Sequence, residues 1–166
     1  MLKHDGIPTP EEMQAILPPK ERFDKGPVAI IECFQDIPCD PCIAACPCRA
    51  ISMQEGITDK PHLDAAKCTG CALCVSCCPG LAIFIVNTVH AKNVAALTLP
   101  YEMLPVPKVG SVVQGLDRTG KAVCEAKVIR VLSGKKFDRT HAVTIELPKA
   151  QAMNVRAIKV QRGTAK

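Results

Sequence analysis

Apolar and polar positions alternate along the chain in a pattern that predicts short strands separated by turns. Apolar runs at 28–31 and 81–86 predict two buried strands, and the longer run is far below the roughly 20 residues of a membrane-spanning helix. Beyond about residue 105, turn residues separate four further expected strands, at 110–116, 122–132, 141–147 and 155–160. The C-terminal part is therefore predicted to be a small β-domain, built as a barrel or curled sheet.

The N-terminal segment, 1–27, carries one short helical signal. Thr9 is a suitable N-cap, Pro10 fits a first helical turn, and Pro18-Pro19 would end the helix. The apolar residues within it give two alternatives, an arm laid along a partner or a disordered tail. A hairpin is expected further on, around Glu55-Gly56.

The segment from Cys68 to Pro79 reads C-x2-C-x2-C-x3-C-P. This spacing is typical of bacterial [4Fe-4S] sites, in which the first three thiolates hold one cluster and the fourth holds the other. The earlier segment from Cys39 to Pro47 repeats the end of this pattern at a constant offset, including the proline. The repeat predicts two pseudo-equivalent halves and two [4Fe-4S] clusters.

Two crossed ligand sets follow from this motif. One set is expected to be Cys68, Cys71, Cys74 and Cys46, and the other Cys39, Cys42, Cys78 and a third ligand from the first half. The repeat places Asp36 opposite Cys68, so the usual third cysteine is missing. Cys33 lies three residues before Asp36. We expect Cys33 as the ligand because a thiolate suits iron better than a carboxylate; Asp36 and a three-iron cluster are the alternatives.

Zinc is the main alternative metal, although it needs only four thiolates and gains nothing from the third cysteine or the proline. Cys48, Cys77 and Cys124 are expected to be small buried side chains rather than ligands. Eleven cysteines, an odd number at metal-like spacings with no signal peptide before them, favour a reducing cytoplasm over a disulfide framework.

Charge is distributed unevenly. Residues 1–99 hold 8 Lys and Arg against 11 Asp and Glu, and residues 100–166 hold 13 against 5, so the halves carry −3 and +8. Together with the strand pattern, this predicts four parts: an N-terminal arm (1–27), a two-cluster domain (28–87), a linker (88–104) and a β-domain for subunit docking (105–166). No acid–base pair or nucleophile arrangement indicates catalysis by this chain, which is expected to be a non-catalytic subunit.

Residues 28–86 resemble a two-cluster bacterial ferredoxin through their two cysteine motifs. The fold class expected is α+β, with a ferredoxin-like two-cluster domain followed by a small barrel-like all-β domain. The segments at 37–42, 77–83 and 104–110 are similar to small iron–sulfur subunits of flavin-dependent dehydrogenases acting on proline, hydroxyproline or sarcosine-like amino acids. That resemblance implies transfer of single electrons between flavoprotein partner subunits or to an external acceptor, with FAD on those subunits and none on this chain.

Two other functions remain open. The chain could be a standalone ferredoxin, or an iron–sulfur protein that binds nucleic acid through its basic C-terminal half. The second is poorly supported, because only Tyr101 and Phe137 are available there to stack on bases.

Overall fold

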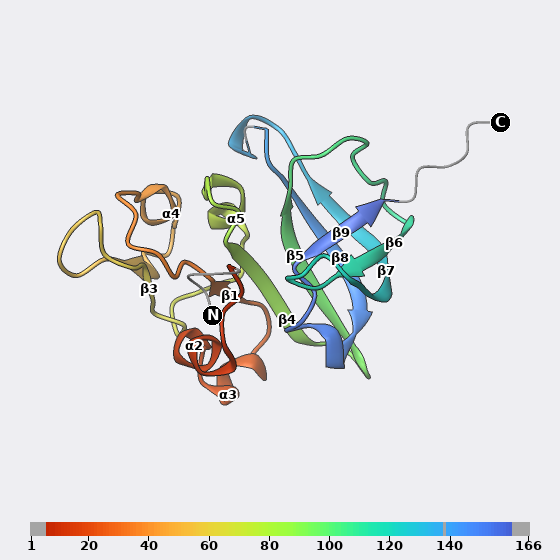
Figure 1. Cartoon of the computed structure of the whole chain (residues 1–166), viewed down its shortest axis with the longest axis horizontal. Coiled ribbons are helices and arrows are strands. Elements are labelled where there is room, and N and C mark those ends of the chain that lie inside the picture. The colour runs from red at the N-terminus through yellow and green to blue at the C-terminus, as the bar shows by residue number, and fades with distance from the viewer. Residues whose placement is uncertain (1–5, 138, 161–166) are drawn as a thin grey trace.

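The computed structural model describes residues 6–137 and 139–160. Helices in this part of the chain are short, and strands predominate (Figure 1). The helices are α2 (Pro10–Ile16), α3 (Lys20–Phe23), α4 (Pro41–Ala44) and α5 (Leu73–Cys77), with 3-10 turns at Lys135–Phe137 and Lys149–Gln151. The strands are β1 (Val28–Ile31), β2 (Ile51–Ser52), β3 (His62–Leu63), β4 (Ile83–Ala91), β5 (Val94–Tyr101), β6 (Val112–Leu116), β7 (Ala122–Leu132), β8 (His141–Pro148) and β9 (Ala157–Val160).

One antiparallel sheet of seven strands runs through both halves of the chain. Its order is β1-β4-β5-β8-β7-β6-β9, which leaves β1 and β9 at the edges. Figure 1 shows the short helices and the β2–β3 hairpin gathered on one side, with β4 leading from them into the larger sheet. The expected C-terminal strands are confirmed within a few residues, and a short 3-10 helix separates the last two.

Residues 88–104, which the sequence led us to expect as a linker, are mostly strand. They contain the end of β4 and the whole of β5, and β5 lies between β4 and β8. Pro100, which lies within this range, is the second-last residue of β5 and pairs with Ala142. A proline near a strand end costs the sheet little, because few ladder hydrogen bonds remain to be lost there. The expected linker is therefore wrong as a description of these residues.

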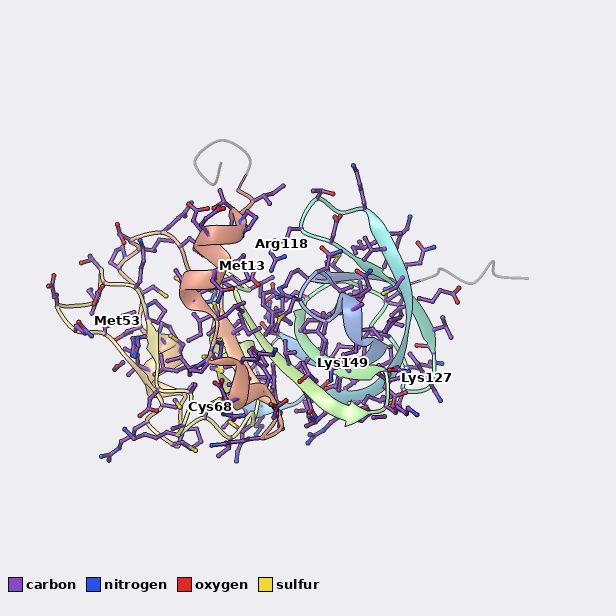
Figure 2. The ribbon with its side chains drawn as sticks, turned by 90° about the horizontal axis from the view of Figure 1, so that it is seen from below. Met13, Met53, Cys68, Arg118, Lys127 and Lys149 are labelled. Atoms are coloured by element: carbon purple, nitrogen blue, oxygen red, sulfur yellow. The ribbon has the colours of Figure 1, made fainter. Side chains whose placement is uncertain are left out.

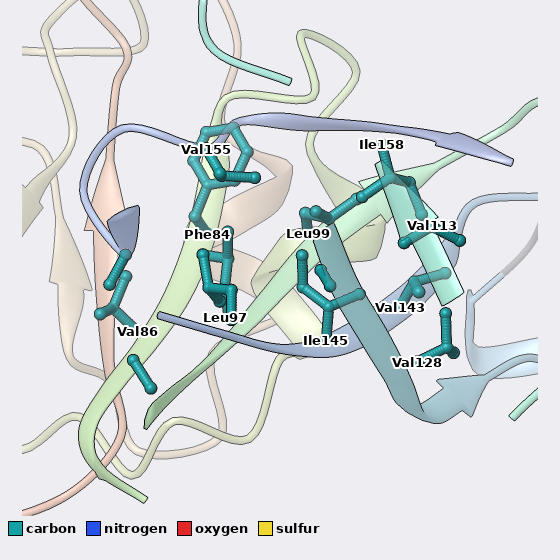
Figure 3. Packing of buried hydrophobic residues seen from close by; sticks show 14 of the residues in the cluster. Phe84, Val86, Leu97, Leu99, Val113, Val128, Val143, Ile145, Val155 and Ile158 are labelled. Atoms are coloured by element: carbon teal, nitrogen blue, oxygen red, sulfur yellow. The ribbon is translucent and has the colours of Figure 1, made fainter. Parts of the chain in front are cut away.

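The main core lies along the large sheet. Its largest fully buried side chains are β-branched or leucine, and the β-branched ones suit a pleated surface well (Figure 3). The members labelled there are Phe84, Val86, Leu97, Leu99, Val113, Val128, Val143, Ile145, Val155 and Ile158. A second core surrounds the cysteines and also receives Ala142 of β8 and Leu132 of β7. The large sheet thus contributes side chains to both cores.

The internal sequence repeat is visible as a repeat of structure. Ile31 of β1 pairs with Ile83 of β4, and Leu63 of β3, the repeat equivalent of Ile31, pairs with Ile51, the equivalent of Ile83. Helix α4 begins at Pro41 and α5 at Leu73, which are again equivalent positions of the repeat. Strands of one half pair with strands of the other half at equivalent positions, in agreement with the two pseudo-equivalent halves expected from the sequence repeat.

The described part of the N-terminal arm packs on its own chain. Thr9 caps α2 in a capping box with Glu12, as its position suggested. Ile16, Leu17 and Phe23 are partly buried against the main core. The apolar face that suggested an arm on a partner therefore packs in part within the chain, and Ile16 and Leu17 also line a cavity.

Candidate metal centre

One cavity is lined by four predicted ligands, Cys46, Cys68, Cys71 and Cys74, which we call the second cysteine group. Cys46 comes from the first motif, whereas the other three come from the second motif. Cys48 and Thr69 also line this cavity, and the rest of the lining is apolar and includes Ala29, Ile51 and Ile85. The fold therefore brings the crossed set together in mainly apolar surroundings.

The first cysteine group consists of Cys33, Cys39, Cys42 and Cys78. Three of these, Cys33, Cys39 and Cys78, line one cavity, and Cys78 reaches it from the second motif. Cys42 is buried in α4, and its sulfur is close enough to those of Cys39 and Cys78 to interact with them electrostatically. The remaining predicted ligands are thus gathered in a second, separate place.

Cys33 and Asp36 occupy different environments. Cys33 follows β1 and is half-buried beside Cys78 and Cys39. The Asp36 side chain is 75% exposed, lies 3.6 Å from Lys60 Nζ, and is absent from the lining of that cavity. This placement favours the cysteine over the carboxylate as a ligand.

Backbone N–H groups point at three of the ligand sulfurs. Ala29 donates to Cys68 Sγ at 3.4 Å, Ala50 to Cys46 Sγ at 3.2 Å, and Ala82 to Cys78 Sγ at 3.4 Å. Such bonds stabilise negative charge on sulfur and raise the reduction potential of a bound iron–sulfur cluster. The position equivalent to Ala29 in the other half is Pro61, which has no N–H to donate.

Burial governs the protonation of the candidate ligands. It raises the pKa of Cys42 to about 11, with the neighbouring sulfurs of Cys77, Cys78 and Cys39 adding to the effect. Burial likewise raises the pKa of Cys33 and, far more strongly, that of Cys74. Without a metal these side chains are neutral thiols at pH 7, so a metal must displace their protons to bind.

The three other cysteines differ in their surroundings. Cys77 is half-buried between the two groups, donates to the Cys74 carbonyl at 3.4 Å, and has a pKa raised to about 11, chiefly by burial. Cys48 lies 3.6 Å from the Thr69 hydroxyl. Cys124 is partly buried against the main core, 3.1 Å from where a Cβ on Gly115 would stand.

Arg22 and Gly70 hold the loop that carries Cys68. Arg22 donates to four carbonyl oxygens, among them that of Cys68 at 2.7 Å and that of Ala65 at 2.7 Å. Gly70 has φ +68°, and a Cβ there would lie 2.6 Å from Pro27 Cβ. The arm thus shapes the second cysteine group from outside the motif, a role that the sequence analysis missed.

The donor sets can accommodate iron–sulfur clusters. Among the described residues, no three His, Cys, Asp or Glu side chains converge as ligands of one metal ion. A [4Fe-4S] cluster distributes four thiolates over four irons and needs a wider arrangement. Each group here offers four soft sulfur donors around a cavity or beside it, a donor set that suits iron–sulfur clusters and zinc and not hard ions.

Sequence reasoning also missed a charged network next to the first cysteine group. Glu32, which directly precedes Cys33, is bound by Arg118 and Arg156. A glutamate directly after four fully apolar strand residues was the available signal, because a charge at such a position needs a partner.

Comparisons with known proteins agree with this donor chemistry. No protein-family profile and no solved structure matches the chain. Over 71 residues it is 42% identical to "Uncharacterized ferredoxin MJ0155" of Methanocaldococcus jannaschii, covering 43% of this chain and 42% of that protein. Over 52 residues it is 38% identical to "Putative oxidoreductase UacF" of Escherichia coli (strain K12), covering 31% of this chain and 8% of that protein.

The chain therefore spans less than half the length of these curated relatives. The similarities support an iron–sulfur protein of the ferredoxin-like class with a general role in electron transfer. In the described part of the chain, no helix has the length and apolar character needed to cross a membrane.

Proposed function

We propose that this chain is an electron-transfer subunit that holds two [4Fe-4S] clusters and relays single electrons between flavoprotein subunits of an amino-acid dehydrogenase complex. The observation that carries the proposal is the crossed gathering of cysteines, in which Cys46 joins the second cysteine group and Cys78 joins the first. Two domains, ferredoxin-like and barrel-like, are proposed within the continuous sheet. A reducing cytoplasm would keep the thiols free to bind iron.

Each part of the chain has a role in this function. A bound [4Fe-4S] cluster supplies one-electron redox chemistry. The eight cysteines hold the metal, and the N–H groups of Ala29, Ala50 and Ala82 stabilise the negative charge on sulfur. Ile51 and Ile85 keep water away from the cavity of the second cysteine group. Flavoproteins are suitable partners, because a reduced flavin can release its two electrons one at a time, with FAD carried by those partners.

The connection between β5 and β6 supports docking to a larger protein. It exposes Met103 (63%), Leu104 (81%) and Val109 (63%), and Val112 at the start of β6 is 50% exposed. Two hydrogen bonds fix the conformation of this connection: Tyr101 Oη donates to the Pro105 carbonyl at 3.1 Å, and Ser111 Oγ donates to the Lys108 carbonyl at 2.6 Å. A fixed conformation lowers the entropy cost of binding a partner. This apolar connection in the basic half fits a partner surface that is apolar with acidic surroundings.

Purification without oxygen tests the proposal. We expect iron near eight atoms per chain, an EPR signal after reduction, and FAD-bearing subunits that copurify. Cys33→Ala should remove one cluster, whereas Asp36→Ala, the matched control, should leave both. A flavin-free monomer with two clusters would instead support a standalone ferredoxin, and a chain without iron would exclude electron transfer by clusters.

A further inference from the structure

Glu32 is clamped between two arginines that are remote in sequence. Arg118, 86 residues away, binds both carboxylate oxygens, with Nε to Oε2 at 2.9 Å and Nη2 to Oε1 at 2.6 Å. Arg156, 124 residues away, adds Nε to Oε1 at 2.5 Å. The network joins the turn before β7 and the segment before β9 to the residue that precedes Cys33.

All three side chains are largely removed from water. Their exposed fractions are 9% for Glu32, 18% for Arg118 and 5% for Arg156. Arg156 also lies over the Phe84 ring, 4.9 Å from its centroid, and donates to the carbonyls of Ala152 and Val155. In Figure 2, Arg118 lies near Met13 where the N-terminal arm faces the large sheet, and its Nη2 is 3.6 Å from the Met13 sulfur.

The network does not balance its own charge. Two guanidinium groups face one carboxylate, which leaves one positive charge in a site that water screens poorly. Glu32 lines the same cavity as Cys33, Cys39 and Cys78. Arg118 and Arg156 line a neighbouring cavity together with Glu32. The carboxylate therefore faces the first cysteine group, and the two guanidinium groups lie behind it. The Glu32 N–H also donates to the Ala82 carbonyl at 2.8 Å, and Ala82 donates to Cys78 Sγ.

We propose that Glu32, Arg118 and Arg156 form an electrostatic positioning group for the first cysteine group, which fixes the backbone at Cys33 and sets the reduction potential of a cluster bound there. The inference rests on the proposed function, because it needs a cluster at this site. Positive charge near a cluster favours the reduced form, and negative charge opposes it. Removing the negative charge of Glu32 and removing the positive charge of Arg118 should therefore shift the reduction potential in opposite directions.

The test is a redox titration of the loaded full-length protein, followed by EPR. Glu32→Gln should raise the potential of the first site and Arg118→Gln should lower it, each by about tenfold in the reduced-to-oxidised ratio, or about 59 mV for one electron. The double variant should return close to the parent value. The Cys33→Ala protein, which should retain only the second site, identifies the signal that must not move.

Lys121→Gln is the matched control, because it removes an exposed cation from the same turn as Arg118. Solvent and salt screen such a charge, so its effect on the potential should be small. Arg118→Lys keeps the positive charge but loses the bidentate hydrogen bond to Glu32. It perturbs the network less than Glu32→Gln and can be measured if Glu32→Gln does not fold.

Shifts of the same sign in Glu32→Gln and Arg118→Gln, or equal shifts at both sites, would overturn the inference. So would unmoved potentials accompanied by a lower unfolding temperature, since a purely structural brace predicts that result. In each of these cases the proposed function survives, because the clusters are still present and redox-active. A parent protein without iron would overturn the proposed function and this inference together.

Discussion

The N–H of Ala50 donates to Cys46 Sγ at 3.2 Å, and at the equivalent position of the repeat Ala82 makes the same bond to Cys78 Sγ at 3.4 Å. Each alanine carbonyl also accepts from the opposite half, since Asp64 N–H donates to Ala50 and Glu32 N–H to Ala82. Both bonds concern the fourth cysteine of a motif, the one placed with the other half's group. The repeat has thus preserved the local structure that holds each crossing sulfur.

This crossing predicts the effect of removing Cys46. Cys46→Ala should abolish the cluster of the second cysteine group, although Cys46 lies in the first motif, because its sulfur lines that cavity with Cys68, Cys71 and Cys74. Iron should fall from about eight to about four atoms per chain. Iron analysis and EPR of the reduced protein would measure this loss.

Cys78→Ala is the reciprocal variant and should remove the other cluster. The two variants should therefore retain different EPR signals. If both variants retained the same signal, the crossed assignment would be wrong.

Gly70→Ala should damage the second cysteine group from outside the ligand set. The new Cβ would lie 2.6 Å from Pro27 Cβ and would also strain a backbone with φ +68°. Gly120→Ala is matched for the strain, with φ +81°, but meets nothing within 4 Å. We expect about 1 kcal/mol of destabilisation in the control, and a larger loss together with iron loss in Gly70→Ala. Equal thermal stability and equal iron content in the two variants would contradict this account.

The sequence predicted the local features of this molecule well. The strand at 28–31, the Thr9 cap and the strand pattern after residue 105 follow from side-chain periodicity and capping chemistry, which act over a few residues. The internal repeat also identified the cysteines that the fold gathers into two groups. These features share a dependence on spacing along the chain.

Long-range relationships were not predictable in this way. Nothing near Glu32 in sequence indicates Arg118 or Arg156, because the three meet only through the order of strands in the sheet. Residues 88–104 were misjudged as a linker for a related reason, because β5 is held in the sheet by pairing with β8, which is remote in sequence. The role of Arg22 likewise depends on carbonyls 43 and 46 residues away.

Leu97→Ala should test whether the two proposed domains unfold together. Leu97 is fully buried in β5, the strand between β4 and β8, so truncation should cost about 2–5 kcal/mol. Because β7 and β8 also contribute to the core around the cysteines, we expect the sheet and the clusters to be lost in one shared transition at lower denaturant. Circular dichroism and cluster absorbance in one titration would show this. Separate transitions of the circular dichroism and the cluster absorbance in Leu97→Ala would show that the domains unfold independently. The control is Val112→Ala, at an exposed position, which should change stability by about 0.5 kcal/mol or less.

Thiol labelling should separate ligands from bystanders without removing any residue. Cys71 is exposed, yet as a ligand it should resist alkylation in the loaded protein and react rapidly once a chelator has removed the iron. Half-buried Cys124, which packs against the main core away from both cysteine groups, is the control and should react at a similar rate before and after chelation, because no metal protects it. Mass spectrometry of peptides from protein labelled without oxygen would assign each site. Rapid labelling of Cys71 in the fully loaded protein would remove it from the ligand set.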